Sequence, residues 1–193
     1  MKKIVVATGN KDKVREISAM LTDYQVISQK EAGFFGDIVE DGATFYENAL
    51  IKAKTVSMAL GVDALADDSG ISVDALNGEP GIYSARYSEE GTNEKNNEKL
   101  LKNLEGVKNR KAKFCCALVL YKTTGEIISA YGETEGEILL KEEGHNGFGY
   151  DPIFYSYDLQ KSLGIASDEE KNTISHRARA LKNLLEKLKW KLL

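Results

Sequence analysis

The sequence contains few cysteines and few histidines, and this scarcity excludes two kinds of site. Among 193 residues there are only two cysteines, Cys115 and Cys116, which are neighbours in an apolar run that predicts a strand. Successive strand side chains point to opposite faces, so we do not expect a disulfide between them. The lack of a disulfide framework suits a reducing cytosol. With only His145 and His176, the chain cannot build a metal site from several histidines.

Long hydrophobic runs and an excess of positive charge are also missing. No apolar stretch approaches the roughly 20 residues of a membrane-spanning helix, and the run at residues 4–7 is too short for a signal peptide. The net charge of −4 argues against a protein that coats nucleic acid. A hydrophobic content of 42% and a charged content of 29% indicate a soluble globular protein. We therefore expect one cytoplasmic domain spanning residues 1–193, without repeats or linkers.

The most unusual stretch is Ala66-Asp67-Asp68-Ser69-Gly70. An apolar run at 62–66 enters it and an alternating run at 71–75 leaves it, so we expect it at the tip of a strand. Adjacent carboxylates repel each other, and burial increases the cost. A bound cation would compensate, and Mg²⁺ commonly takes one or two protein carboxylates together with substrate phosphates. The alternative is an ordinary Asp-Asp-Ser-Gly turn that caps backbone groups.

A short polar loop near the start of the chain is a candidate phosphate site. Residues 4–7 predict a buried strand, and the apolar spacing of residues 14–21 predicts a helix. The loop between them is Thr8-Gly9-Asn10-Lys11-Asp12-Lys13. Backbone N–H groups at a helix start, flanked by lysines, bind phosphate well. The loop is not a Walker motif, because the second glycine and the Lys-Ser/Thr pair are missing. It could equally be a capping loop with solvated lysines.

A second helix is predicted between Thr44 and Gly61. Thr44 and Glu47 form a capping-box pattern, and Gly61 is a typical residue after a helix end. Lys52 falls beside the apolar stripe of this helix, where it either snorkels to solvent or reaches into a cleft. Glu40, just before the helix, is either a solvated loop carboxylate or a second metal ligand.

The middle of the chain predicts strands and one polar helix. Residues 92–104 read as the helix, and residues 112–121 form the longest apolar strand. A turn signal at Thr124-Gly125 leads to an apolar run at residues 127–131, and residues 133–140 then alternate polar and apolar, so we expect antiparallel strands. Because the first third of the chain alternates strands and helices, we expect an α/β fold with a mixed sheet.

The stretch from Gly147 to Pro152 places Phe148 between two glycines. Such a ring has no local neighbour to pack on, and glycines allow the backbone to approach a flat group closely. A base stacked on the ring would gain about 1–3 kcal/mol. The alternative is a tight turn with a core phenylalanine.

The C-terminal part predicts two helices with a break near Ser175. Ser167 begins a capping-box pattern that leads to Lys171, and His176 and Arg177 would open the final helix. Cations are disfavoured in a first helical turn, which favours an anionic or carbonyl ligand there, unless both side chains are solvated. We expect the final helix to dock on the body of the protein, not on a membrane, through one apolar face. That face comprises Ala178, Leu181, Leu184, Leu185, Leu188 and Leu192.

Together these stretches resemble the inosine triphosphate pyrophosphatase family over nearly the whole chain. The resemblance rests on six motifs in family order: residues 7–13, 44–53, 66–70, 78–87, 147–152 and 170–177. It implies an elongated α/β fold with a mixed β-sheet flanked by helices, two lobes with a central substrate cleft, and a homodimer. The implied activity is Mg²⁺-dependent cleavage of ITP, dITP and XTP to monophosphate and pyrophosphate, which cleanses the nucleotide pool. Residues 162–166 depart from the Thr-Phe-Ala-Glu-Leu pattern of the family, so the conformation of that loop is open.

The resemblance also implies roles for individual residues. Asp68 is the candidate general base and metal ligand, Glu40 the second metal ligand, and Asp67 an assisting carboxylate. The residues implied to hold the phosphates are Thr8, Gly9, Asn10, Lys11, Asp12, Lys13, Lys52 and Ser69. Those implied to bind the base are Phe148, Gly149, Tyr150, Asp151, Lys171, His176 and Arg177.

N–H groups facing the purine 6-position would donate to a keto oxygen but could not pair with the amino group of adenine, which is itself a donor. Each buried donor left unpaired costs about 1–3 kcal/mol.

Two other functions fit parts of the sequence. One is a pyrophosphatase for modified pyrimidines or damaged bases, and the other is a module that senses nucleotides without hydrolysing them. The carboxylates that a catalyst needs are all present, which favours an enzyme. We expect no stable nucleic-acid or membrane partner.

Overall fold

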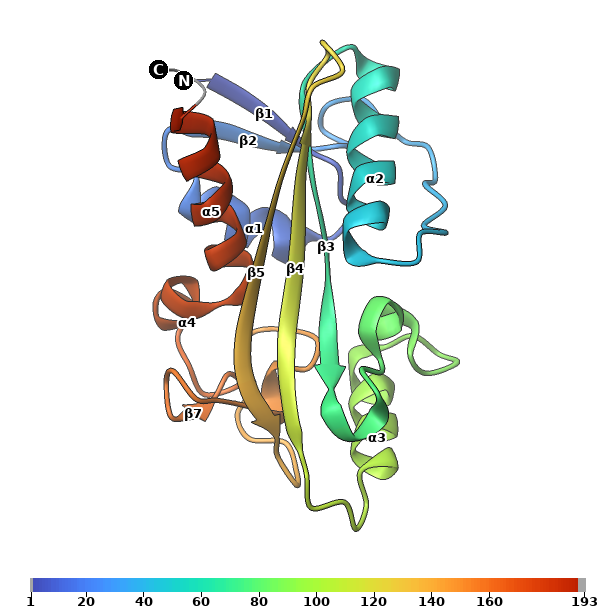
Figure 1. Ribbon diagram of the computed structural model, residues 1–193, viewed down its shortest axis with the longest axis vertical. Coiled ribbons are helices and arrows are strands. Elements are labelled where there is room, and N and C mark those ends of the chain that lie inside the picture. The colour runs from blue at the N-terminus through green and yellow to red at the C-terminus, as the bar shows by residue number, and fades with distance from the viewer. Residues whose placement is uncertain (1, 191–193) are drawn as a thin grey trace. The chain divides into compact units, whose positions relative to one another are not determined.

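The computed structural model describes residues 2–190, and its chain folds into two compact units (Figure 1). Unit 1 contains the residues up to Asp68, then Cys116–Gly132, and the residues from Arg177 on. Unit 2 contains Ser69–Cys115 and Glu133–His176. Each unit is therefore assembled from segments that are distant in sequence.

Within the described residues 2–190 the sheet has seven strands, and it is mixed, as the sequence predicts. Its order is β2-β1-β3-β4-β5-β6-β7. Strand β1 pairs in parallel with β2 and β3, whereas β6 pairs antiparallel with β5 and β7. The strands are β1 (Lys2–Val6), β2 (Tyr24–Ser28), β3 (Ala64–Val73), β4 (Lys111–Tyr121), β5 (Ile127–Ile138), β6 (Phe154–Ser156) and β7 (Lys161–Ser162).

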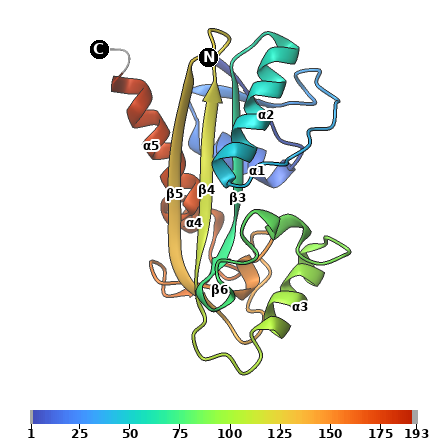
Figure 2. The ribbon, with the colours of Figure 1, turned by 45° about the vertical axis from the view of Figure 1, so that its right-hand side comes forward.

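In unit 1, helices cover both faces of the strands. The helices are α1 (Lys11–Met20), α2 (Phe45–Leu60) and α5 (His176–Trp190). Because side chains alternate along a strand, Ala64 and Ala66 of β3 pack with α2, while Leu65 packs with α1 and α5. Figure 2 shows α2 and α5 on opposite sides of the strands. The same alternation decides what each aspartate of β3 meets.

The helix ends of unit 1 follow the predicted signals with two changes. Gly61 ends α2 with a φ of 65°, and Thr44 caps its start. The carboxylate of Glu47 accepts from the N–H of Ala43, one residue before the cap, so the predicted capping box is incomplete. Helix α1 begins at Lys11, not near Val14, because the side chain of Asn10 caps its first turn.

Unit 2 packs its own core around the parts of β3, β4 and β5 that belong to it. That core includes Ile71 of β3, Phe114 of β4, Phe154 of β6 and Leu100 of the helix at Asn93–Asn103. Gly70 is required here, because a Cβ at this position would collide with the backbone and side chains of the segment after Pro80. The helical elements of unit 2 are η1 (Asp74–Leu76), η2 (Gly81–Arg86), α3 (Asn93–Asn103), η3 (Asp151–Ile153) and α4 (Asp168–Ile174).

Two strand predictions were wrong in the same way. The Asp67–Gly70 stretch lies inside the continuous strand β3, not at a strand tip, and the two strands predicted at 127–131 and 133–140 are one strand, β5. In both cases backbone pairing continues through polar or glycine residues whose local preference is for a turn. The departing loop at 162–166 buries Leu163 and Ala166 in the core of unit 2.

The predicted helix break is confirmed, since α4 ends at Ile174, Ser175 is its C-cap and α5 begins at His176. Leu181 and Leu184 of α5 are buried, which confirms a docked helix, whereas Leu192 lies outside the described residues.

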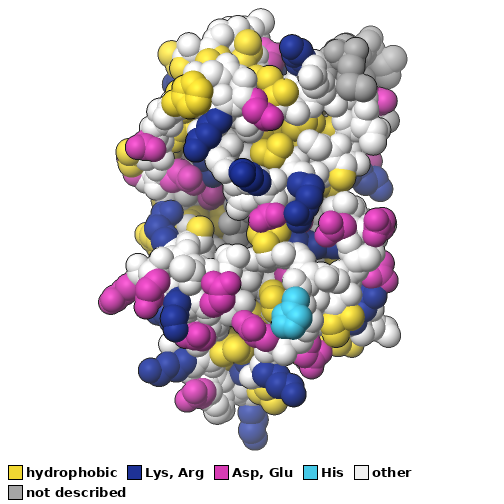
Figure 3. Space-filling model, turned by 180° about the vertical axis from the view of Figure 1, so that it is seen from behind, with side chains coloured by type: hydrophobic (Ala, Val, Ile, Leu, Met, Phe, Trp, Pro, Cys, Tyr) yellow, Lys and Arg dark blue, Asp and Glu magenta, His cyan; other side chains and the backbone are white. Residues whose placement is uncertain are grey.

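Within residues 2–190, no helix has the length and apolar character needed to cross a membrane. Acidic and basic side chains are interspersed on the face drawn in Figure 3.

Candidate active site

Strand β3 presents its two adjacent aspartates to opposite faces of unit 1. Asp67 lies two residues after Leu65, so its side chain faces α1 and α5 as that of Leu65 does. Asp68 lies two residues after Ala66, so its side chain faces α2. Their partners confirm this, because Asp67 pairs with residues of α1 and α5 and Asp68 with residues of α2. The repulsion expected between neighbouring carboxylates is therefore offset by separate cations on each face.

The Asp67 cluster, formed by Lys13, Glu16, Asp67 and Arg177, is a buried ion-pair network. Lys13 Nζ lies 3.1 Å from Asp67 Oδ2, and Arg177 donates to the same oxygen from Nε at 3.2 Å and Nη2 at 3.0 Å. Arg177 also donates to Glu16 through Nη1. Asp67 has no exposed surface and Arg177 is 1% exposed. This arrangement keeps both charges fixed in the interior.

The pKa shifts of this cluster follow from its cations and carboxylates. Burial alone would raise the pKa of Asp67, but Lys13, Arg177 and Lys52 outweigh it and hold that pKa well below its usual range. Burial alone would lower the pKa of Arg177, but Asp67 and Glu16 outweigh it and raise it. Asp67 therefore stays ionised at neutral pH and is a poor proton acceptor.

The Asp68 cluster, formed by Glu40, Asn48, Lys52 and Asp68, lies on the other face. Lys52 Nζ is 2.9 Å from Asp68 Oδ1 and 2.8 Å from Glu40 Oε2, so one ammonium bridges both carboxylates. Asn48 Nδ2 donates to the second oxygen of Asp68 at 3.3 Å. The Oδ1 of Asn48 accepts from the N–H of Gly42 at 2.9 Å, which fixes the amide.

The pKa shifts of the Asp68 cluster differ from those of the Asp67 cluster. Burial raises the pKa of Asp68, and the nearby ammonium of Lys52 only partly offsets this. Burial would lower the pKa of Lys52, but Asp68, Asp67 and Glu40 outweigh it and raise it. Asp68 is therefore a stronger base than a solvated aspartate, while Lys52 stays charged.

The two clusters also differ in charge balance. The Asp67 cluster has two cations and two carboxylates, whereas the Asp68 cluster has one cation and two carboxylates. The Asp68 cluster therefore has one negative charge more than it has positive charges. Its carboxylate groups offer oxygen ligands, which suit Mg²⁺. Within residues 2–190 no group of three or more acidic, histidine or cysteine side chains could hold a metal. Glu40 and Asp68 fit an ion that takes its other ligands from substrate and water.

The predicted phosphate loop forms the start of α1. Asn10 Oδ1 accepts from the N–H of Asp12 at 2.8 Å and of Lys13 at 3.2 Å, and its own N–H donates to Thr8 Oγ1 at 3.1 Å. Asp12 pairs with Arg15 at 3.1 Å. Gly9 and Lys11 are exposed. Of the predicted phosphate ligands, the structure brings Lys13 and Lys52 to the two aspartates, and Ser69 follows Asp68 directly in β3.

The predicted base-binding loop belongs to unit 2. The carboxylate of Asp151 accepts from the N–H of Phe148 at 2.8 Å and from Lys171 Nζ at 2.6 Å. The same ammonium lies 4.5 Å from the centroid of the Phe148 ring. Gly147 has a φ of 73°, and a Cβ there would collide with Asp151. Asp151 therefore holds both an aromatic ring and a hydrogen-bond donor in place.

Further contacts within unit 2 hold the other predicted base-binding residues. Asn97 Nδ2 donates to the carbonyl oxygen of Gly149 at 3.2 Å. Tyr150 donates its hydroxyl to the carbonyl oxygen of Ser84 at 2.7 Å. His176 stacks on Phe114 of β4, with centroids 4.9 Å apart and the ring planes at 12°. Arg177, also predicted to bind the base, belongs to unit 1, where its guanidinium binds the carboxylates of Glu16 and Asp67.

Sequence reasoning did not select several supporting residues. Asn48 lies four residues before Lys52, so helical spacing could have placed it on the same face. Glu16 lies three residues after Lys13, and the same rule applies. Asn97, Ser84 and Phe114 have no local sequence signal, because they act on residues 52, 66 and 62 positions away in the chain.

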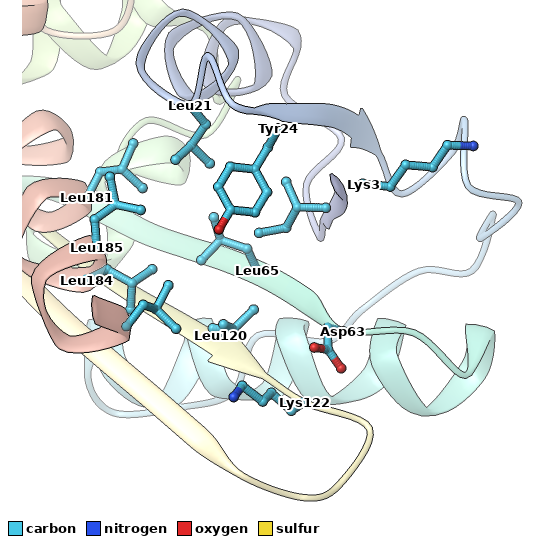
Figure 4. Close-up of a pocket in the computed structure, with 12 residues that line it drawn as sticks. Lys3, Leu21, Tyr24, Asp63, Leu65, Leu120, Lys122, Leu181, Leu184 and Leu185 are labelled. Carbon is cyan, nitrogen blue, oxygen red and sulfur yellow. The ribbon is translucent and has the colours of Figure 1, made fainter. Parts of the chain in front are cut away.

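An apolar cavity in unit 1 is separate from these clusters. Its volume is about 270 Å³, and Leu65, Leu120 and Leu181 are among the side chains that line it, with Lys3, Asp63 and Lys122 as its charged members (Figure 4). None of the predicted site residues contributes to its lining. Its leucine-rich wall does not suit a polyphosphate.

Comparison with known proteins identifies the family. The sequence profile of the Ham1 family matches residues 4–187. The chain belongs to the Ham1 family. It is similar to the dITP/XTP pyrophosphatase of Bacillus licheniformis, with 49% identity over 95% of this chain and 96% of that protein. It is also similar to the dITP/XTP pyrophosphatase of Clostridium perfringens, with 46% identity over 98% of each.

Solved structures of Ham1 proteins share the fold. The Staphylococcus aureus Ham1 protein has a TM-score of 0.89 and 42% identity, covering 98% of this chain and all of that one. The Coxiella burnetii HAM1 protein has a TM-score of 0.87 and 40% identity, covering 98% of this chain and 99% of that one. The α/β fold with a mixed sheet and flanking helices is thus confirmed by both topology and likeness.

Proposed function

We propose that this Ham1 protein hydrolyses dITP, XTP and ITP to the nucleoside monophosphate and pyrophosphate, and so removes deaminated purines from the nucleotide pool. The observation that carries the proposal is the Asp68 cluster. It combines a carboxylate of raised pKa with a buried lysine, and it has one negative charge in excess. Full-length relatives named dITP/XTP pyrophosphatase support the substrate.

In the proposed reaction, Asp68 accepts a proton from the attacking water. Its raised pKa makes it the better base of the two aspartates, while Asp67 assists by fixing Lys13 near the phosphates. Lys13, Lys52 and the N–H groups of residues 8–13, together with Ser69, bind the phosphate oxygens. Phosphoryl transfer depends mainly on such positioning and charge neutralisation.

We propose Mg²⁺ as the metal, held by Glu40 and Asp68 together with substrate oxygens. When bound, the ion would neutralise charge on the phosphates. The oxygen-only donors and the excess negative charge of the cluster support this choice. Loss of pyrophosphate release in chelator, with recovery on adding Mg²⁺, is the expected result, and full activity in chelator would contradict it.

We further propose that unit 2 binds the base. Phe148 would stack on the purine, and Lys171, whose ammonium lies over the same ring, would donate to the keto oxygen at position 6. The amino group of adenine would place a donor against this donor, and a buried unpaired donor costs about 1–3 kcal/mol. Gly149, Tyr150, Asp151 and His176 complete the proposed base site of unit 2.

One assay tests the function. The purified chain is incubated with Mg²⁺ and dITP, XTP, ATP or UTP, and pyrophosphate and phosphate are measured separately. We expect pyrophosphate from dITP and XTP, and little from ATP. Equal turnover of UTP would favour the pyrimidine alternative, and binding without release would favour a nucleotide sensor.

We also propose that the chain acts as a single pyrophosphatase domain, forms a homodimer and works in the cytoplasm. Phe35 and Val39, 78% and 75% exposed, offer apolar surface that a second copy would cover. Light scattering should then give twice the 21.3 kDa chain mass. The thiols of Cys115 and Cys116 suit a reducing compartment.

A further inference from the structure

Lys52 occupies the position where the two proposed metal ligands converge. Its Nζ lies 2.8 Å from Glu40 Oε2 and 2.9 Å from Asp68 Oδ1. Lys52 is 7% exposed and projects from α2, which is anchored by its Thr44 cap and its buried Ala49 and Ala53. The ammonium is therefore a cation held by the fold itself between two carboxylates.

A divalent ion and this ammonium compete for the same oxygens. If the ion entered while Lys52 stayed, two cations would face each other at close range in a buried site, where charges interact strongly. If Lys52 left without a new partner, a buried charge would lose both of its ion pairs, which is costly. Metal binding to the free protein therefore carries a penalty that comes from Lys52.

A polyphosphate removes this penalty. Its oxygens give the Lys52 ammonium a new anionic partner, so the carboxylates become available to the metal. The bound phosphates also supply the ligands that two carboxylates lack, since no third acidic, histidine or cysteine ligand completes the set within residues 2–190. Binding of metal and of polyphosphate is then mutually favourable, and each strengthens the other by the same factor.

We propose that Lys52 is a tethered counter-ion that keeps a divalent cation off the Glu40–Asp68 pair until a polyphosphate arrives. The inference rests on the proposed function, because it assigns metal ligation to these carboxylates. It adds that metal binding is regulated: in the protein without nucleotide, the Lys52 side chain occupies the carboxylates and disfavours binding of the metal.

The experiment measures binding of Mn²⁺ alone, without nucleotide, by calorimetry or by electron paramagnetic resonance. Lys52→Met keeps the length of the side chain and removes the charge. We expect it to bind Mn²⁺ about 5- to 150-fold more tightly than the wild type, the usual size of coupling between two sites. Lys54→Met is the matched control, because Lys54 lies on the same helix and is exposed, and it should bind as the wild type does.

A double variant tests whether the added Mn²⁺ affinity of Lys52→Met comes from the Glu40–Asp68 pair. In Lys52→Met/Glu40→Gln the added affinity should disappear, because one of the two carboxylates is gone. If the gain persists in the double variant, the ion binds elsewhere and the proposal is wrong. It is equally overturned if Lys52→Met and the wild type bind Mn²⁺ within about twofold of each other.

A measurement on the wild type covers the case in which Lys52→Met does not fold. The ε-methylene signal of Lys52 in protein with ¹³C-labelled lysine, assigned by its loss in Lys52→Arg, should stay in place when Mg²⁺ is added alone. It should shift when Mg²⁺ is added with a non-hydrolysable inosine triphosphate analogue. A shift with Mg²⁺ alone overturns the proposal. None of these readouts uses turnover, so failure of the pyrophosphate assay and failure of the counter-ion role are distinguishable.

Discussion

Arg177 donates two hydrogen bonds to a single oxygen of Asp67, from Nε at 3.2 Å and from Nη2 at 3.0 Å. The two residues are 110 positions apart in sequence and are both almost fully buried. Arg177 also pairs with Glu16. The first turn of α5 is thereby tied to β3 and α1, which explains why a cation is tolerated where the helix dipole disfavours it.

Replacing Arg177 should therefore reduce stability strongly. Arg177→Met leaves Asp67 and Glu16 buried without their shared guanidinium, and breaking a buried pair costs about 3–5 kcal/mol. The free energy of unfolding in urea measures the loss. Lys182→Met, an exposed position on the same helix, should change it by less than about 0.5 kcal/mol. Similar losses in both variants would mean that the ion pairs do not stabilise the fold.

Asp67 should make stability depend on pH. Its pKa is lowered in the folded protein from an ordinary value of 3.8, so the unfolded chain takes up a proton first. The stability that Asp67 provides is full above about pH 3.8 and is lost as the pH falls toward the folded pKa. Urea unfolding of the wild type and of Asp67→Asn between neutral and acid pH tests this. The difference between them should shrink below about pH 3.8, and a constant difference would contradict the assignment.

Asp68→Asn should abolish turnover while nucleotide binding persists. The amide retains the shape but cannot accept the proton, and a general base contributes about 10²–10⁴ to the rate. Pyrophosphate release from dITP and calorimetry with a non-hydrolysable analogue separate the two effects. Asp23→Asn, an exposed change of the same charge, is the control. Turnover within a few-fold of the wild type would remove Asp68 from the role of base.

Phe148→Ala should raise KM for dITP with little change in kcat. Loss of a stacked base costs about 1–3 kcal/mol, which corresponds to roughly 5- to 150-fold in KM. Phe148→Trp keeps an aromatic face beside Lys171 and should remain close to the wild type. An unchanged KM in the alanine variant would show that the ring does not carry the base.

Cys116 should resist alkylation in the native protein. Its side chain is fully buried, and burial raises the pKa of its thiol to about 12. The thiolate is the reactive form, so at pH 8.5 little of it is present. Iodoacetamide labelling followed by peptide mass spectrometry should modify Cys116 only after denaturation, and Cys115→Ser removes ambiguity from the neighbouring thiol. Rapid labelling of the native chain would contradict this.

Local signals predicted the helix ends well and the long strands poorly. Thr44, Gly61 and Ser167 marked real boundaries because capping chemistry acts within a few residues. The Asp67–Gly70 stretch was predicted as a strand tip because its composition favours turns. Its extended conformation depends on pairing with neighbouring strands and on the close approach of the segment after Pro80 to Gly70. A single sequence does not contain those partners in any local pattern.

For the candidate site, the sequence predicted individual residues but few of their contacts. Lys52 and Glu40 were selected together with Asp68, and the structure joins all three through one ammonium. The link from Arg177 to Asp67 was not foreseen, because charge pairing over 110 residues requires the fold to be known.

The alternation of side chains along β3 also sets a limit on how this site can vary. Because the two aspartates face opposite ways, they are not interchangeable, although they are chemically identical neighbours. Inserting or deleting a single amino acid between Leu65 and Asp67 would turn each carboxylate toward the other's partners. We therefore expect the segment that leads from the apolar residues of β3 to this acidic pair to tolerate amino-acid substitutions far better than insertions or deletions.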